Sequence, residues 1–222
     1  MGLVLHGSRV FEGAATPESD YDVFLIVQDG DQPEHWRSQR SSAVDLEVTS
    51  MSGFRSAVLD GGDTNRYIFG HAQVLLDRLG GQVSALLQEA GTFPAGDLAN
   101  LPVMLDGYMN LLYRSIKSSR DGRDLAAHLD AAMSVNVVLW VIFALHRRQR
   151  PPNKYLAWDL ERYPLGDPPW EASGLLPRIR RILVDADPAS QRALFRDVEK
   201  AARADGLGET VDSWGNDLEM LR

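Results

Sequence analysis

The chain has 222 residues, of which 44% are hydrophobic and 24% are charged, and its net charge is −8. These values are typical of a globular protein with one large domain or two small ones. The lack of cysteine excludes a disulfide framework and a thiolate metal site, and the acidic balance argues against a large polyanionic partner. A small or cationic partner suits this charge better.

The first half of the chain alternates short strand patterns with helical ones. Apolar or alternating runs predict four strands, at residues 3–5, 21–27, 42–49 and 71–76. The second run is almost continuously apolar, which is typical of a strand covered on both faces, and the polar loop 29–33 ends it. The third run alternates, so Asp45 and Glu47 should lie on one face of it.

Beyond a linker at residues 92–96, nearly every pattern is helical. Apolar residues at helical spacing predict helices over residues 101–118, 124–148 and 187–206. Pro151 follows the second of these, and Asp187 with Pro188 supplies an N-cap and a first-turn proline for the third. We therefore predict an α+β protein, with a small α/β domain carrying a mixed sheet at residues 1–92 and a helical domain at residues 93–222.

Neither a leader nor a membrane span is expected. The N-terminal residues lack a basic segment and a long apolar stretch. The most apolar run, residues 135–145, is shorter than the roughly 18 residues that a span needs. We expect a buried helix there, no contact with a membrane, and a cytoplasmic protein.

The chemistry is concentrated in Gly7, Ser8, Asp20, Asp22 and Asp45. The two carboxylates of Asp20 and Asp22 are two residues apart at the start of a strand, so both should project from one face. A neighbouring strand could add Asp45 to them. Three clustered carboxylates repel one another unless a divalent cation is bound, and oxygen-only ligands suit Mg²⁺.

Two such ions can activate an attacking hydroxyl and stabilise a pyrophosphate leaving group. Gly7 permits a close backbone approach, and the Ser8 hydroxyl with nearby N–H groups can hold a triphosphate. The pattern therefore predicts a site for two Mg²⁺ ions and a nucleoside triphosphate. The residues do not select a base, and ATP is the donor we expect first.

The whole pattern resembles the nucleotidyltransferase core of the DNA polymerase beta superfamily. The turn at residues 5–8 is similar to the phosphate-binding turn of that family, residues 20–22 to its paired metal ligands, and residues 44–46 to the strand with its third ligand. Most relatives carry a helix before the first strand. Here the chain begins almost on that strand, so we expect either a minimal or a trimmed start.

The second half resembles the helical domains of aminoglycoside- and lincosamide-type antibiotic nucleotidyltransferases, over residues 123–156. This resemblance implies that Lys154 contacts the nucleotide phosphates and that Asp130 acts as base toward the acceptor hydroxyl. Arg9, next to the glycine–serine turn, is a further candidate phosphate ligand. An exposed structural role is an equally ordinary reading of Arg9 and Lys154, and a solvated helix position is the commoner reading of Asp130.

The third metal ligand and a basic run each have two interpretations. Glu47 competes with Asp45 as the third metal ligand, or lies beside the site as a solvent-facing neighbour. The basic run of Arg147, Arg148 and Arg150 either complements a helix dipole at a solvated helix end or neutralises a triphosphate.

These features predict transfer of a nucleoside monophosphate to a hydroxyl of an antibiotic-like small molecule, with release of pyrophosphate. Two further functions fit the same residues: nucleotidylation of a macromolecule, either a protein side chain or tRNA, and nucleotide binding by a non-catalytic module. The acidic charge makes nucleic acid the less favoured acceptor. The sequence predicts no particular oligomeric state.

Overall fold

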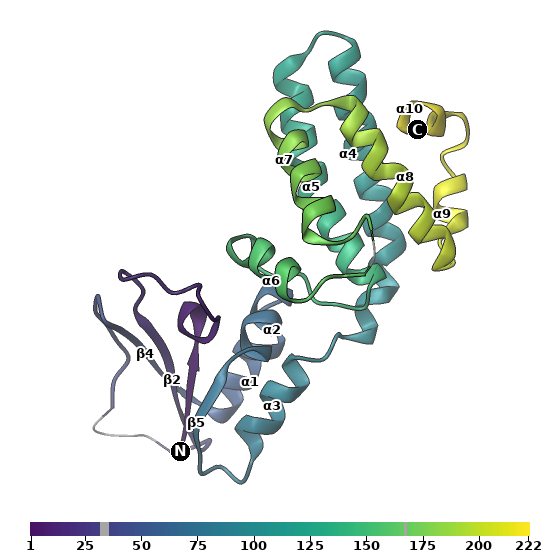
Figure 1. Ribbon diagram of the computed structural model, residues 1–222. Helices are drawn as coiled ribbons and strands as arrows, with labels where there is room; N and C mark the ends of the chain where they lie inside the picture. Colours follow the sequence, from purple (N-terminus) through teal and green to yellow (C-terminus); the bar gives the residue numbers. More distant parts are fainter. Residues whose placement is uncertain (32–35, 167) are drawn as a thin grey trace. The chain divides into compact units, whose positions relative to one another are not determined.

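The computed structural model describes residues 1–31, 36–166 and 168–222 (Figure 1). The chain divides into two compact units. The first contains Met1–Phe93 together with Pro151–Leu156, and the second contains Pro94–Arg150 and Ala157–Arg222. The sequence placed residues 93–222 in one domain; by its contacts, the short segment Pro151–Leu156 packs with the first unit.

The first unit is built on a five-stranded mixed sheet with the order β3-β4-β2-β1-β5. Its strands are β1 Gly2–His6, β2 Tyr21–Val27, β3 Gln39–Arg40, β4 Val44–Ser50 and β5 Gln73–Asp77. The central pair, β2 and β4, is parallel, whereas all the other neighbours are antiparallel. The first residues of β2 and β4 consequently lie at the same edge of the sheet.

Helices α1 Met51–Leu59, α2 Asp63–Gly70 and α3 Gln82–Ala90 pack on the sheet (Figure 1). Their apolar side chains and those of the strands form one core, which contains Val4, Phe24, Ile26, Phe54, Phe69, Val83 and Leu86. Leu25, which alternates with Phe24 and Ile26, is also buried, as the continuous apolar run predicts for a strand covered on both faces.

The predicted strand at residues 21–27 is confirmed, and the others differ at their ends. The last strand begins at Gln73 because His71 still caps α2, its N–H bonding to the Ile68 carbonyl. Strand β3 was not predicted, since two residues are too few to show a pattern. Residues 32 and 33 of the predicted polar loop lie outside the described residues.

The second unit is helical. It contains α4 Leu101–Arg120, α5 Asp124–Leu145, α6 Leu156–Arg162, α7 Ala172–Asp185, α8 Pro188–Ala204, α9 Gly208–Asp212 and α10 Leu218–Leu221. Leu156, the first residue of α6, is the one residue of these helices that belongs to the first unit. Short 3-10 turns occur at Ala95–Asn100 and Gly215–Asp217 in this unit, and at Gly7–Val10 and Asn153–Tyr155 in the first unit. With the sheet of the first unit, these helices confirm the predicted α+β class.

Of two predicted helix boundaries, the start of α8 agrees with the structure and the end of α5 differs from it. Asp187 caps α8 as expected, its carboxylate accepting a 2.9 Å hydrogen bond from the Ser190 N–H. Helix α5 ends at Leu145 rather than at residue 148, because Arg147 takes a left-handed conformation with φ of 55°. The Arg148 N–H then bonds to the Phe143 carbonyl at 2.9 Å and closes the helix in a Schellman-type turn.

Within the described residues, α5 is the one helix long and apolar enough to cross a membrane. Its most apolar stretch of 18 residues has a mean hydropathy of 1.7, yet half of that stretch is buried in the protein. It packs against α4 and α7, so its apolar character is that of a core helix of the second unit.

Candidate metal centre

Three carboxylates meet at the edge of the sheet where β2 and β4 begin. Asp22 and Asp45 are the second residues of these parallel strands and are direct register partners, and Asp20 immediately precedes β2. One oxygen from each of the three side chains lies within 4.8 Å of the other two. The structure thus brings together the three predicted ligands in a geometry that fits a divalent cation.

Glu47, the competitor for the third position, does not join the three aspartates. It follows Asp45 by two residues on β4 but pairs in register with Phe24, deeper along the sheet. Its side chain is exposed, and it is absent from the carboxylate group that the described residues form. Asp45 is therefore the better third ligand.

Gly7 lies directly against the Asp22 carboxylate. Its φ of 72° is left-handed, and a Cβ atom built on it would come within 1.9 Å of the Asp22 Oδ2. A side chain at position 7 would therefore clash with the Asp22 carboxylate and would strain the backbone as well. Ser8 is buried in the turn that follows, and its carbonyl accepts the Phe11 N–H.

Electrostatic repulsion is visible in the pKa of Asp22, which is raised above its ordinary value. Burial is the largest cause, and the negative charges of Asp20 and Asp45 add to it. The positive charges of Lys154 and Arg40 act in the opposite direction. A bound cation would relieve the same repulsion.

His6, the register partner of Asp22 on β1, is neutral at pH 7. Burial lowers the pKa of His6 to about 4, against a smaller opposing effect of Asp45. Its ring packs against Phe24 and Phe69, with centroid separations of 5.1 and 5.2 Å. We interpret His6 as a structural residue beneath the carboxylates rather than as a ligand.

Arg9 is engaged by the loop that carries Asp20. Its guanidinium donates to the backbone carbonyls of Ser19 and Asp20, the latter at 3.4 Å, and lies 4.6 Å from the centroid of the Tyr21 ring. In this arrangement Arg9, which belongs to the turn after Gly7 and Ser8, holds the loop that carries Asp20. Its predicted contact with a phosphate remains a prediction.

Lys154 belongs by its contacts to the first unit, although it follows α5 in sequence. Its positive charge lowers the pKa of Asp22, so the ammonium group acts on the carboxylate cluster. Its Nζ lies 4.8 Å from the centroid of the neighbouring Tyr155 ring. A positive charge beside three carboxylates suits the predicted contact with a triphosphate.

Asp130 and the basic run are placed in the second unit. The buried Asp130 on α5 forms a 2.9 Å ion pair with Arg114 on α4, so its role as a base remains a prediction. Arg147 pairs with Asp205 at 2.7 Å and Arg148 with Asp159 at 2.5 Å. Arg150 donates to Asn136 and lies over the Trp140 ring. Each arginine of the run therefore has partners within the helical unit, and Arg147 also donates to carbonyls at the end of α5, as expected of a basic residue at a helix C-terminus.

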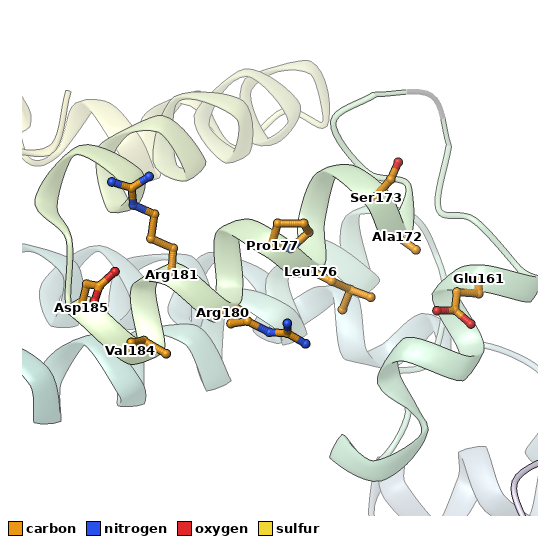
Figure 2. Close-up of a pocket in the computed structure, with 9 residues that line it drawn as sticks. All are labelled: Glu161, Ala172, Ser173, Leu176, Pro177, Arg180, Arg181, Val184 and Asp185. Atoms are coloured by element: carbon orange, nitrogen blue, oxygen red, sulfur yellow. The ribbon is translucent and has the colours of Figure 1, made fainter.

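An open groove of about 660 Å³ runs along α7 in the second unit (Figure 2). Figure 2 shows that Glu161 of α6 lies at one end of the row of lining residues, whereas the other labelled residues come from α7. Arg180, Arg181 and Asp185 give it both signs of charge. None of the three clustered carboxylates lines it.

Sequence reasoning missed one charged contact of the cluster. Arg40 on β3 is the register partner of Asp45, and its Nε lies 3.3 Å from the Asp45 Oδ2. The serine pair that follows Arg40 could have indicated this contact, because serine favours tight turns. The Ser41 hydroxyl binds the Val44 backbone in a tight turn, which brings residues 40 and 45 opposite each other.

No protein-family model matches the sequence, and no curated protein matches it. Among solved structures, a nucleotidyltransferase-like protein from Exiguobacterium sibiricum 255-15 matches with a TM-score of 0.47 and 13% sequence identity. The match covers 98% of this chain and 71% of that one. We base the function of this chain on its own side chains.

Proposed function

We propose that this protein is a Mg²⁺-dependent nucleotidyltransferase, which transfers a nucleoside monophosphate from a nucleoside triphosphate to a hydroxyl group. The observation that carries this proposal is the cluster of Asp20, Asp22 and Asp45 at the shared edge of two parallel strands, with three oxygens within 4.8 Å of one another. The resemblance of the glycine–serine turn and the paired aspartates to the polymerase beta superfamily supports it.

The three carboxylates fit a divalent cation, and we expect two Mg²⁺ ions, which when bound would supply charge neutralisation and activation of the attacking oxygen. In the reaction, the acceptor oxygen forms a bond to the α-phosphorus, and the bond between that phosphorus and the α,β-bridging oxygen breaks. Pyrophosphate leaves with the bridging oxygen, and the proton of the acceptor hydroxyl passes to a base, for which Asp130 is the candidate.

The site residues of the first unit have separate roles in this proposal. Asp20, Asp22 and Asp45 hold the metal ions. Gly7 and Ser8 offer backbone N–H groups and a hydroxyl to the triphosphate, since no side chain at position 7 stands in front of Asp22. Lys154 adds positive charge for the phosphates.

The acceptor we propose is a hydroxyl-bearing, antibiotic-like small molecule in the cytoplasm, and the donor is ATP. The net charge of −8 supports a small or cationic acceptor. A protein side chain or tRNA is the second candidate acceptor. A non-catalytic module is disfavoured because the three aspartates crowd one another. Burial and, to a smaller extent, the charges of Asp20 and Asp45 raise the pKa of Asp22, and a bound cation would relieve this repulsion.

The test is thermal unfolding with ATP, GTP, CTP and UTP in turn, each with and without Mg²⁺. Saturating ligand should raise the Tm, by about 2 to 4 °C for each kcal/mol of binding free energy in a chain of this size. The rise should require Mg²⁺ and should be lost in the Asp20→Asn/Asp22→Asn double variant. Glu47→Gln, on the same strand as Asp45 but outside the cluster, is the matched control and should keep it.

A metal-dependent shift with one nucleotide would identify the donor, and candidate acceptors would then be screened for release of pyrophosphate. Shifts that persist in the double variant would contradict the assignment of the metal site. A shift without pyrophosphate release for any class of acceptor would favour the non-catalytic module.

A further inference from the structure

Lys154 lies at the end of a column of aromatic rings inside the first unit. Its ammonium lies 4.8 Å from the Tyr155 ring centroid, and the Tyr155 ring stacks on Phe11 with centroids 4.1 Å apart and planes at 26°. Phe11 stacks in turn on Tyr67 of α2, at 6.0 Å and 4° between planes, and contacts His71 at 5.2 Å. The column thus joins Lys154 to the sheet unit through side chains alone.

The three rings of this column, those of Phe11, Tyr67 and Tyr155, are buried in the fold. Phe11 is 1% exposed and directly follows the 3-10 turn that contains Gly7 and Ser8. Tyr67 is 3% exposed on α2, and Tyr155 is also 3% exposed. A buried ring that stacks on a buried ring has little freedom, so the short segment Pro151–Leu156 is held at the turn that begins the candidate site.

The face of the Tyr155 ring also acts on Lys154 directly. An ammonium over an aromatic face is attracted by the ring quadrupole, which restricts a side chain that otherwise has four rotatable bonds. The face of the ring attracts the ammonium without neutralising it, so the positive charge can still act on an anion.

We propose that Tyr155 is a positioning residue for nucleotide binding: stacked on Phe11, it holds the Lys154 ammonium in place for the triphosphate. This inference rests on the proposed function and adds to it a residue that acts only through Lys154. The Tyr155 hydroxyl has no role in it. That oxygen is buried without a hydrogen-bond partner among the described residues, so the ring alone makes the contacts that matter.

The test compares ATP affinity, measured by calorimetry with Mg²⁺, in the full-length wild type, Lys154→Met, Tyr155→Leu, Tyr155→Phe and the double variant Lys154→Met/Tyr155→Leu. We expect Tyr155→Leu to weaken ATP binding about two- to fivefold, and Tyr155→Phe to bind like the wild type because the ring is kept. The double variant should bind no more weakly than Lys154→Met, because both changes remove the same interaction.

Binding of Mn²⁺ alone, followed by electron paramagnetic resonance, separates positioning from general damage. Tyr155 is not part of the carboxylate cluster, so Tyr155→Leu should bind Mn²⁺ at least as tightly as the wild type. Should the leucine variant fail to fold, Tyr155→Met fills the same space with a flexible side chain and repeats the comparison.

The outcomes distinguish the inference from the proposed function. Wild-type protein that binds no ATP would overturn both. If the wild type binds ATP, three results would overturn the positioning role alone. They are ATP affinity that is unchanged in Tyr155→Leu, losses of ATP affinity that add in the double variant, and loss of Mn²⁺ binding together with ATP binding in Tyr155→Leu. Losses that occur in Tyr155→Leu, are restored in Tyr155→Phe and do not add to Lys154→Met would establish it.

Discussion

The pKa of a carboxylate is shifted in opposite directions in the two units of this molecule, as Glu199 and Asp22 show. In the helical unit, Glu199 on α8 is held by Arg222 and Arg203, and hydrogen bonds from Arg222 are the main cause that lowers its pKa. In the sheet unit, burial and two like charges raise the pKa of Asp22. Among the described residues, the one ion pair of the three clustered aspartates is that of Asp45 with Arg40, whose side chain is 81% exposed.

The difference distinguishes carboxylates that stabilise the fold from carboxylates that a bound cation would stabilise. A carboxylate with an arginine partner stabilises the folded state more when it is charged than when it is protonated, so it contributes to stability at neutral pH. Carboxylates that face one another cost folding free energy, which a bound cation would offset. Substitutions in the two units should therefore change stability and activity in different directions.

The largest expected effect is that of Asp22→Asn on nucleotidyl transfer. Loss of a central metal ligand should lower the rate by roughly a thousandfold, the equivalent of about 4 kcal/mol of transition-state stabilisation. The same change removes one of the repelling charges, so without divalent cation the variant should be at least as stable as the wild type. Pyrophosphate release and chemical denaturation in a chelator measure these two effects.

Glu47→Gln again provides the matched control, because it removes a negative charge from the same sheet without touching the cluster. It should keep transfer activity. Equal loss in the two variants would show that net charge, rather than metal chelation, governs the rate. A clearly destabilised Asp22→Asn protein would contradict the repulsion among the three aspartates.

The next effect concerns stability in the helical unit. Glu199→Gln leaves Arg203 and Arg222 without their shared carboxylate and should lower the free energy of unfolding by about 2 kcal/mol at pH 7. Because the folded pKa of Glu199 lies below its unfolded value, the charged form stabilises the fold above the unfolded pKa. This contribution is lost as the pH falls through the folded pKa.

Urea denaturation of wild type and Glu199→Gln from pH 7 downward would follow this loss. The two curves should converge in acid. A difference that stays constant across the range would show that shape, rather than charge, makes Glu199 important.

The parts of the molecule that the sequence predicted are those whose signal is local. Asp20 and Asp22 are two residues apart, and an alternating run put Asp45 on a strand, so the ligands could be named before any contact was known. Their register could not, because pairing of Asp22 with Asp45 depends on the parallel order of β2 and β4. Local periodicity carries no information about strand order.

The misses share that physical cause. Strand β3 is only two residues long, and its Arg40 becomes relevant only by lying opposite Asp45. Tyr155 and Phe11 are 144 positions apart (155 − 11), so no spacing rule connects the rings that stack at 4.1 Å. Arg9 is not one of the misses: its donors bind the backbone carbonyls of the loop with Asp20, and its contact with a phosphate stays a prediction.

Arg9→Met distinguishes a role of Arg9 in holding the loop of Asp20 from a role in binding phosphate. If Arg9 holds the loop of Asp20, its loss should weaken binding of Mn²⁺ alone by about three- to tenfold, since a misplaced ligand loses part of its contact with the ion. If Arg9 instead contacts phosphate, Mn²⁺ binding should be unchanged and only ATP affinity should fall. Titrations of the same variant with each ligand distinguish the two roles.

The smallest effect should come from Arg40. Its guanidinium competes with a metal ion for the Asp45 carboxylate, so Arg40→Gln should raise the affinity for Mg²⁺ or Mn²⁺ rather than lower it. Because the Arg40 side chain is 81% exposed, the ion pair is screened by water and the gain should be about twofold. Arg55→Gln, which removes an exposed ion pair with Glu89 elsewhere in the same unit, should leave metal affinity unchanged. Weaker metal binding in Arg40→Gln would mean that the ion pair holds Asp45 in its ligating position, so that Arg40 supports the cluster instead of competing for it.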